Sequence, residues 1–288
     1  MDWVNAIVQG ILLGGFYALF ATGLSLVFGV MRIVNLAHGD LSVLAAYIAV
    51  LLADHAGVNP FVSLLIVIPV MAIGGFVFQF ALLNFTLDSE LAPLLATFGL
   101  AVIIENALQQ GFSGNAQALH PGAIATDSIQ VTSQISIGWF PLITLIAAVL
   151  LLVGLQVVIR YTGLGRALRA TSDDQRAAQL VGIDNRRLFA IAMAISLATA
   201  AVAGLFLAIR TSFTPTAGPL RLIFAFEAVI IGGLGSLWGT LLGGIVLGVA
   251  QSIGAQISPG WNVLAGHIVF LAILLVRPTG LLGRTAPA

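Results

Sequence analysis

Hydrophobic residues run in long stretches along this chain, and short polar segments separate them. A helix needs about 20 apolar residues to cross the roughly 30 Å of hydrocarbon in a bilayer. The stretches that approach or exceed this length are Ala6–Val30, Phe61–Leu83, Phe140–Ile159, Leu188–Ile209 and Leu237–Ile253. The pattern predicts an all-α, polytopic membrane protein, with residues 1–288 forming a single transmembrane domain.

Other segments are less regular, and they leave the number of crossings open. Further spans are expected near residues 40–53, 91–110 and 262–276. The stretch Leu222–Gly235 is short, contains Glu227 and ends in a glycine cluster, which favours a broken or re-entrant helix buried in protein. We therefore expect eight or nine transmembrane or re-entrant helices.

Composition supports the membrane assignment and excludes several kinds of chemistry. Hydrophobic residues make up 59% of the chain and charged residues 8%, whereas soluble domains are roughly a quarter charged. The formal charge of zero gives no sign of nucleic-acid binding, and the absence of Cys excludes disulfides and thiolate metal sites. Without Lys the chain has no P-loop, and it has no Gly-x-Ser-x-Gly elbow, His-Glu-x-x-His pair or Cys cluster. We therefore expect that the chain is not an enzyme and has no catalytic, cofactor-binding or metal residues, with ATP hydrolysis in partner subunits.

Charge distribution predicts the orientation. Six of the eleven basic residues lie between residues 160 and 187, namely Arg160, Arg166, Arg169, Arg176, Arg186 and Arg187. Arg-rich short loops remain in the cytoplasm, so 160–187 is expected there. Residues 111–138 contain no Lys or Arg and are expected to form a periplasmic loop.

The cytoplasmic loop contains signals for a helix near residues 173–181. Ser172 and Gln175 have the spacing of a capping box, and Gly182 suits the helix end. Small and apolar residues follow the start, at Ala177, Ala178, Leu180 and Val181. Two interpretations stay open: a connector lying on the headgroups, or a docking helix for a soluble partner.

A polar group interrupts the apolar pattern just after Arg32, near the expected cytoplasmic boundary. One His and one carboxylate suit a proton relay or a metal pair, but no further ligand lies nearby in the sequence. We therefore predict a structural turn in which polar side chains satisfy backbone groups. Its residues are Asn35, His38, Gly39 and Asp40.

Several polar residues fall inside predicted spans, where such groups usually face the bundle interior or a water-filled path. Glu105 and Gln109 share one helix face, and Glu227 and Gln251 lie in two later spans. Lining a solute pathway and hydrogen bonding between helices remain equal alternatives. His267, in the last span, is expected to be a hydrogen-bonded packing residue.

Three segments resemble the shorter permease type of high-affinity branched-chain amino acid ABC importers, and the resemblance covers nearly the whole chain. They are Gly14–Asp40, with GGFYALFATGLSLVFGVMRIVNLAHGD; the loop with GLGRALRA at Gly163–Ala170 followed by Asp174, Ala178 and Gly182-Ile183; and Gly232–Gly244, with GGLGSLWGTLLGG.

This resemblance implies that the helix in the loop is a coupling helix seated in a cytoplasmic ATPase. The ATPase-coupling residues would be Ser172, Asp173, Asp174, Ala177, Ala178, Val181, Gly182 and Ile183. It also implies a second, longer permease, two ATPases that bind ATP and Mg²⁺, and a periplasmic solute-binding protein. The expected location is the bacterial inner membrane, and the expected mechanism is alternating access.

The transported solute is left open by the sequence. The resembled family also includes importers of urea, short amides and other small carboxylic compounds, and branched-chain amino acids are the favoured solute. The alternative function is ion-coupled secondary transport, with Glu105 or Glu227 as the coupling group. Whether the permease pair is homomeric or heteromeric is also left open.

Overall fold

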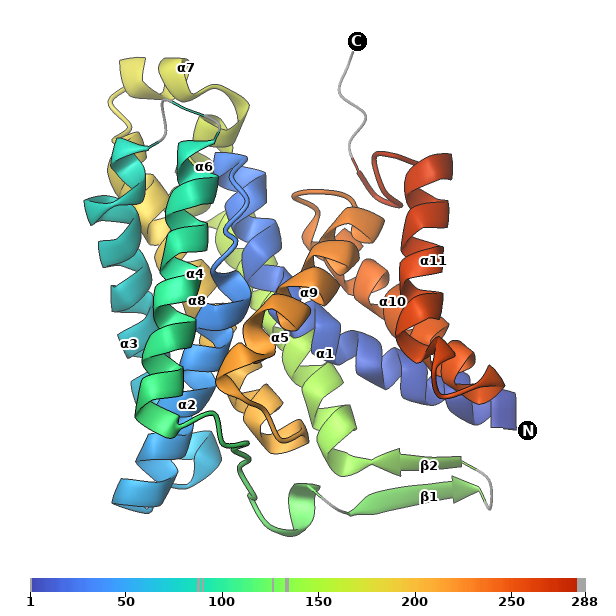
Figure 1. Cartoon of the computed structure of the whole chain (residues 1–288). Helices are drawn as coiled ribbons and strands as arrows, with labels where there is room; N and C mark the ends of the chain where they lie inside the picture. Colours follow the sequence, from blue (N-terminus) through green and yellow to red (C-terminus); the bar gives the residue numbers. More distant parts are fainter. Residues whose placement is uncertain (1, 87–88, 90, 126, 133–134, 284–288) are drawn as a thin grey trace. The chain divides into compact units, whose positions relative to one another are not determined.

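A computed structural model describes residues 2–86, 89, 91–125, 127–132 and 135–283, and most of them are helical (Figure 1). In the described residues, eight helices are long and apolar enough to cross a membrane. They are α1 Asp2–Met31, α2 His38–Ala56, α3 Pro60–Ala81, α4 Ala92–Phe112, α5 Trp139–Tyr161, α8 Asn185–Arg210, α9 Gly218–Gly232 and α10 Leu237–Ile257.

The remaining elements are short. Helix α11, Trp261–Val276, has 16 residues and is apolar but shorter than a full span. Helices α6, Gly163–Asp173, and α7, Gln175–Leu180, occupy the Arg-rich loop. Short 3₁₀ turns are η1 Leu83–Phe85, η2 Ala123–Ala125 and η3 Pro215–Ala217, and the two strands are β1 Ser128–Thr132 and β2 Ile135–Gly138.

The all-α polytopic prediction is confirmed, with two local differences. Helix α9 is continuous to Gly232, so the predicted break within Leu222–Gly235 is wrong. The glycines follow this helix instead: Gly233 and Gly235 have φ of 104° and 79°, which turns the chain toward α10. The segment expected as an irregular loop contains the antiparallel pair β1–β2.

The chain folds into two compact units. Unit 1 contains Met1–Ser25, His120–Leu152 and Ile223–Ala288, and unit 2 contains Leu26–Leu119 and Val153–Leu222. Helices α1, α5 and α9 contribute residues to both units.

In unit 1, glycines allow α1 and α10 to touch backbone to backbone. A methyl group on Gly10 would come within 2.5 Å of Val249 Cα, and one on Gly244 within 2.7 Å of the Gly14 carbonyl oxygen. The small residues spaced four apart in these helices therefore pack within the chain itself. Gln9 Nε2 also donates to the Ser136 carbonyl at 2.7 Å, which ties the hairpin to α1.

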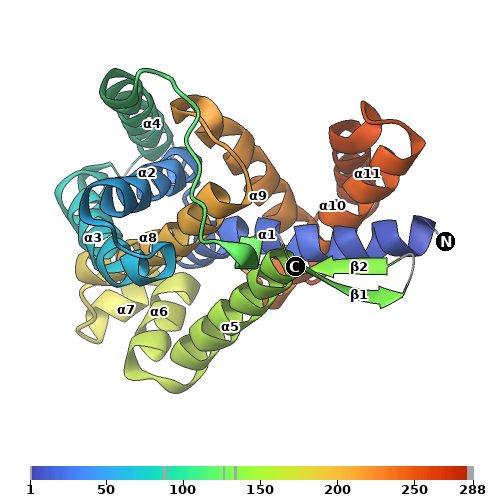
Figure 2. The ribbon, with the colours of Figure 1, turned by 90° about the horizontal axis from the view of Figure 1, so that it is seen from below.

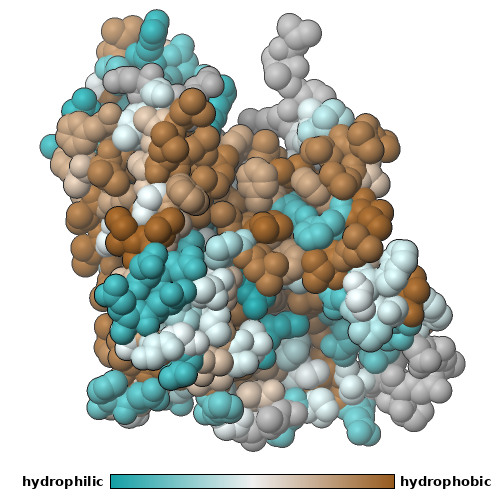
Figure 3. Space-filling view, viewed as in Figure 1, coloured by the Kyte–Doolittle hydropathy of each residue, from teal (hydrophilic) through white to brown (hydrophobic). Residues whose placement is uncertain are grey.

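In unit 2, α2 and α3 pack beside α8, and α4 packs against α2 (Figures 1 and 2). A methyl group on Gly75 of α3 would lie 2.8 Å from the Met193 carbonyl oxygen of α8, so these helices approach closely. The outer faces of α3 and α4 are apolar and exposed, as at Leu65, Ile73, Leu95 and Ile103. Figure 3 shows much of this apolar surface in brown, with hydrophilic residues both near α7 and in a larger patch lower on the same side. Such faces suit contact with lipid.

Candidate functional site

The Arg-rich loop folds into two helices rather than one. Thr162 caps α6, with its hydroxyl accepting from the Gly165 amide at 3.1 Å. Gly165 is needed at this position because a larger residue would meet the backbone of Ile159. The short helix expected near residues 173–181 corresponds to α7, and α6 was not predicted.

The amino end of α7 differs from the predicted capping box. Asp174, not Ser172, is the N-cap, and its Oδ1 accepts from the amides of Arg176 at 2.8 Å and Ala177 at 3.0 Å. These hydrogen bonds from the backbone hold the pKa of the Asp174 carboxyl below its usual value. The prediction failed because α6 continues through Asp173, which places Ser172 inside a helix.

Helix α7 ends just before Gly182, as the sequence predicted. The Ile183 amide donates to the Ala178 carbonyl and the Gly182 amide to the Gln179 carbonyl, both at 3.0 Å. With φ of 88° at Gly182, this is the Schellman arrangement that ends many helices. The six-residue helix is therefore closed at both ends by its own sequence.

The exposed side of α7 presents apolar side chains. Leu180 is 89% exposed and Val181 77% exposed, and Asp173, Asp174, Ala177 and Gly182 are exposed as well. Ala178, expected in the contact surface, is only 3% exposed and instead anchors the helix. Ser172 and Ile183 are half-buried. We call Leu180, Val181 and the exposed residues around them the α7 surface.

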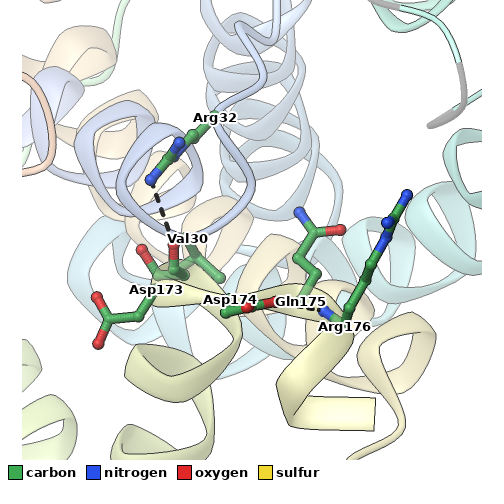
Figure 4. Close-up of a pocket in the computed structure, with 7 residues that line it drawn as sticks. Val30, Arg32, Asp173, Asp174, Gln175 and Arg176 are labelled. Atoms are coloured by element: carbon green, nitrogen blue, oxygen red, sulfur yellow. Dashed lines mark hydrogen bonds between the residues drawn. The ribbon is translucent and has the colours of Figure 1, made fainter. Parts of the chain in front are cut away.

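A pocket of about 330 Å³ lies beside this corner (Figure 4). Val30 and Arg32 border it from the end of α1, and Arg32 reaches toward the Ser172 carbonyl. The other lining residues come from the junction of α6 and α7, at Ser172, Asp173, Asp174, Gln175 and Arg176. The sequence did not single out Arg32 as part of a site.

The predicted turn at Asn35–Asp40 is buried against α8. Asn35 Nδ2 approaches Met193 Sδ at 3.8 Å, about two turns inside α8. A methyl group on Gly204, nearer the other end of α8, would lie 3.0 Å from the Ala46 amide of α2. Helix α2 thus begins within unit 2, and the link before it runs alongside the helices in Figure 1. Its position near the cytoplasmic boundary stays a prediction.

Buried polar contacts hold this irregular segment. Asn35 Oδ1 accepts from the Ala37 amide at 3.0 Å, and Thr97 Oγ1 accepts from the Leu36 amide at 3.2 Å. Non-helical backbone is tolerated at membrane depth only where it is buried in protein, and Asn35, Ala37 and His38 are at most 1% exposed.

Asp40 lies where the starts of α2 and α9 meet. It is 2% exposed, and a methyl group on Gly218 would collide with its carboxyl group. Glu105 of α4 is near enough for its charge to act on Asp40. The structure therefore brings together one residue of the predicted turn and one of the predicted pathway.

Unit 1 contains the other two pathway candidates, each paired across helices. Glu227 of α9 shares a hydrogen bond with His267 Nδ1 of α11, and Glu227 is 4% exposed. Tyr17 of α1 donates to Gln251 Oε1 of α10 at 2.5 Å. Phe224 lies between the pairs, 5.1 Å from the Tyr17 ring and 6.2 Å from the His267 ring.

The polar candidates also differ in accessibility. Glu105 is half-buried and Gln109 is exposed on α4, whereas Glu227 and Gln251 are buried. The sequence identified Glu227 and Gln251 but not their partners, because pairing between distant helices leaves no local pattern. Among the described residues, no group of three or more His, Cys, Asp or Glu side chains could hold a metal ion.

These features define a multi-pass membrane protein of the permease type: apolar spanning helices, an irregular buried segment and an exposed short helix on one end of unit 2. Residues 6–277 match the family described as the permease component of the branched-chain amino acid transport system. The chain belongs to this family.

Individual relatives match along nearly the whole length of this chain. The high-affinity branched-chain amino acid transport system permease protein BraD of Pseudomonas aeruginosa is 29% identical, covering 98% of this chain and 96% of BraD. LivH of Escherichia coli is 28% identical with the same coverage. LivM of Escherichia coli is 28% identical over 94% of this chain and 68% of LivM. No solved structure gives a significant match.

Proposed function

We propose that this chain imports branched-chain amino acids across the bacterial inner membrane, as one permease of an ATP-driven transporter. The observation that carries the proposal is the family match over residues 6–277. The names of BraD, LivH and LivM support the solute, since each is called a high-affinity branched-chain amino acid permease.

In this proposal, the α7 surface docks onto a cytoplasmic ATPase, so that 160–187 is cytoplasmic and 111–138 is periplasmic. Leu180 and Val181 are too exposed to stabilise unit 2, so a protein partner would gain by burying them. ATP and Mg²⁺ bind to two ATPase subunits, because the chain has no Lys for a P-loop. A longer second permease and a periplasmic binding protein complete the assembly.

The solute pathway of the proposed importer uses polar groups held at membrane depth. Glu105 and Gln109 offer accessible side chains on α4, whereas Glu227 and Gln251 are placed by pairs with His267 and Tyr17. Ionisable groups in spans usually face a protein interior or a water-filled path. Alternating access would follow when the ATPases move α7.

Uptake by the reconstituted complex tests this function. Proteoliposomes with the permease pair, the ATPases and the binding protein should accumulate leucine, isoleucine and valine only when ATP is supplied. Removing ATP while an ion gradient is intact should stop uptake. Uptake that continues on the gradient alone would instead identify a secondary transporter, and uptake of urea in place of leucine would contradict the solute.

A further inference from the structure

Two polar contacts connect the junction of α6 and α7 with the end of α1. Ser172 Oγ donates to the Gly29 carbonyl at 2.6 Å, and Arg32 Nη2 lies 3.5 Å from the Ser172 carbonyl. Gly29 is in the last turn of α1, where carbonyls have no amide partner within the helix. Ser172 therefore supplies a donor that α1 itself lacks.

The pocket beside this junction shows why these contacts matter. Its walls are Val30 and Arg32 on one side and the junction of α6 and α7 on the other (Figure 4). Open space of about 330 Å³ means that packed side chains do not fill this part of the junction. Beside this space, Ser172 contacts the end of α1 through its hydrogen bond to Gly29 and its approach to Arg32.

Arg32 also shapes the backbone that follows α1. Its φ of 56° is in the left-handed region, which is unfavourable for residues other than glycine. Its amide donates to the Phe28 carbonyl at 2.9 Å, closing the helix before the chain turns into the irregular segment. Helix α2 begins six residues later, at His38, so Arg32 lies between the junction and the buried segment before α2.

We infer that Ser172 and Arg32 are positioning residues that carry a displacement of α7 into the break between α1 and α2. The inference rests on the proposed function, in which an ATPase moves α7. The break can bend because it has no helical ladder of hydrogen bonds, whereas α7 is closed at both ends and moves as a unit.

A second connection leads from the same junction to α8 and offers a competing route. Asn185 Nδ2 donates to the Gln175 carbonyl at 2.8 Å, and Thr171 donates to Asn185 Oδ1 at 3.2 Å. If the displacement of α7 passed only through Asn185 into α8, α1 would take no part in it. Variants of Ser172 and Arg32 separate the two routes, because neither residue contacts Asn185 in these hydrogen bonds.

The test measures leucine uptake and ATP hydrolysis together in the complete reconstituted complex. Ser172→Ala should lower the uptake per ATP hydrolysed by about fivefold, the effect of one lost hydrogen bond, while the ATPases still copurify. Ser172→Thr keeps the hydroxyl and should restore coupling. Arg32→Gly removes the guanidinium but suits the positive φ, so it should reduce coupling without misfolding.

Matched controls and a double variant make the result decisive. Arg166→Ala removes an exposed Arg from α6, away from the contacts with α1, and should couple normally. The double variant S172A/R32G should lose little more than the stronger single variant, because both act in one connection.

Normal coupling in both Arg32→Gly and Ser172→Ala would overturn the inference. If Ser172→Ala fails to assemble with the ATPases, normal coupling in Arg32→Gly is enough to overturn it. Failure of the proposed function is seen separately, as absence of ATP-dependent uptake by the wild-type complex.

Discussion

Single side chains define the ends of α7, and each uses a different physical effect. Asp174 accepts two backbone hydrogen bonds as a charged cap, and Gly182 adopts a φ that other residues resist. Ser172 was predicted to be the cap but bonds to α1 instead. Neighbouring polar residues in one short loop therefore have separate roles.

Asp174→Ala should fray α7, because the amides of Arg176 and Ala177 lose their acceptor. Hydrogen exchange of residues 175–180 should be faster than in the wild type at neutral pH, and Asp174→Asn should stay close to the wild type because Asn is an equivalent cap.

The pH dependence follows from the lowered pKa of Asp174. Its contribution to helix stability is fully present above the ordinary value of 3.8 and is lost as the pH falls through the lower folded value. The exchange rates of wild type and Asp174→Ala should therefore converge only in acid. Equal exchange in both proteins at neutral pH would contradict the capping role.

The pair Glu227–His267 predicts unequal effects of its two substitutions. His267→Leu leaves a buried carboxylate without its partner and should cost about 1–3 kcal/mol in the free energy of unfolding. Glu227→Gln removes the charge and should cost less. Chemical denaturation in detergent measures both, and a more stable His267→Leu variant would show that the pair is not needed.

At the scale of elements, glycines decide which helices touch. Gly39 and Gly218 let the starts of α2 and α9 meet around Asp40, and Gly10, Gly14, Gly244 and Gly248 do the same for α1 and α10. Small residues are effective in membranes because close backbones gain dispersion contacts that lipid cannot replace.

Gly218→Ala should destabilise the protein by about 1–3 kcal/mol, because the added methyl group collides with Asp40. The matched control is Gly74→Ala in α3, where a methyl group meets no atom within 4 Å. Thermal aggregation of the two purified variants compares them directly. Equal aggregation temperatures would rule out the close approach at Gly218.

At the scale of the whole molecule, the placement of residues 160–187 in the cytoplasm and of 111–138 in the periplasm is a prediction that single cysteines can test. Because there is no native Cys, Arg176→Cys and Asn115→Cys each introduce a unique thiol. An impermeant maleimide added to intact cells should label position 115 in the periplasm but leave position 176 unlabelled until the membrane is opened. Labelling of position 176 in intact cells would reverse the topology.

The spans were largely predictable because a continuous apolar run of about 20 residues indicates by itself that the segment lies in the bilayer. The predicted stretch Leu237–Ile253 lies within α10, and Phe61–Leu83 and Leu188–Ile209 agree with α3 and α8 to within a few residues. Gly182 was also predictable, because left-handed helix ends select glycine locally. The cap at Asp174, the extra helix α6 and the continuity of α9 were missed because each depends on where the preceding helix stops.

The sequence by itself determined that this chain spans the membrane many times and belongs with the branched-chain amino acid permeases, since composition, run length and motifs are properties of the chain alone. Only the tertiary structure decided that Asn35–Asp40 is buried beside α8, that Glu227 pairs with His267, and that Ser172 bonds to Gly29. These contacts join residues from 40 to 158 positions apart, and their geometry arises only when the helices pack.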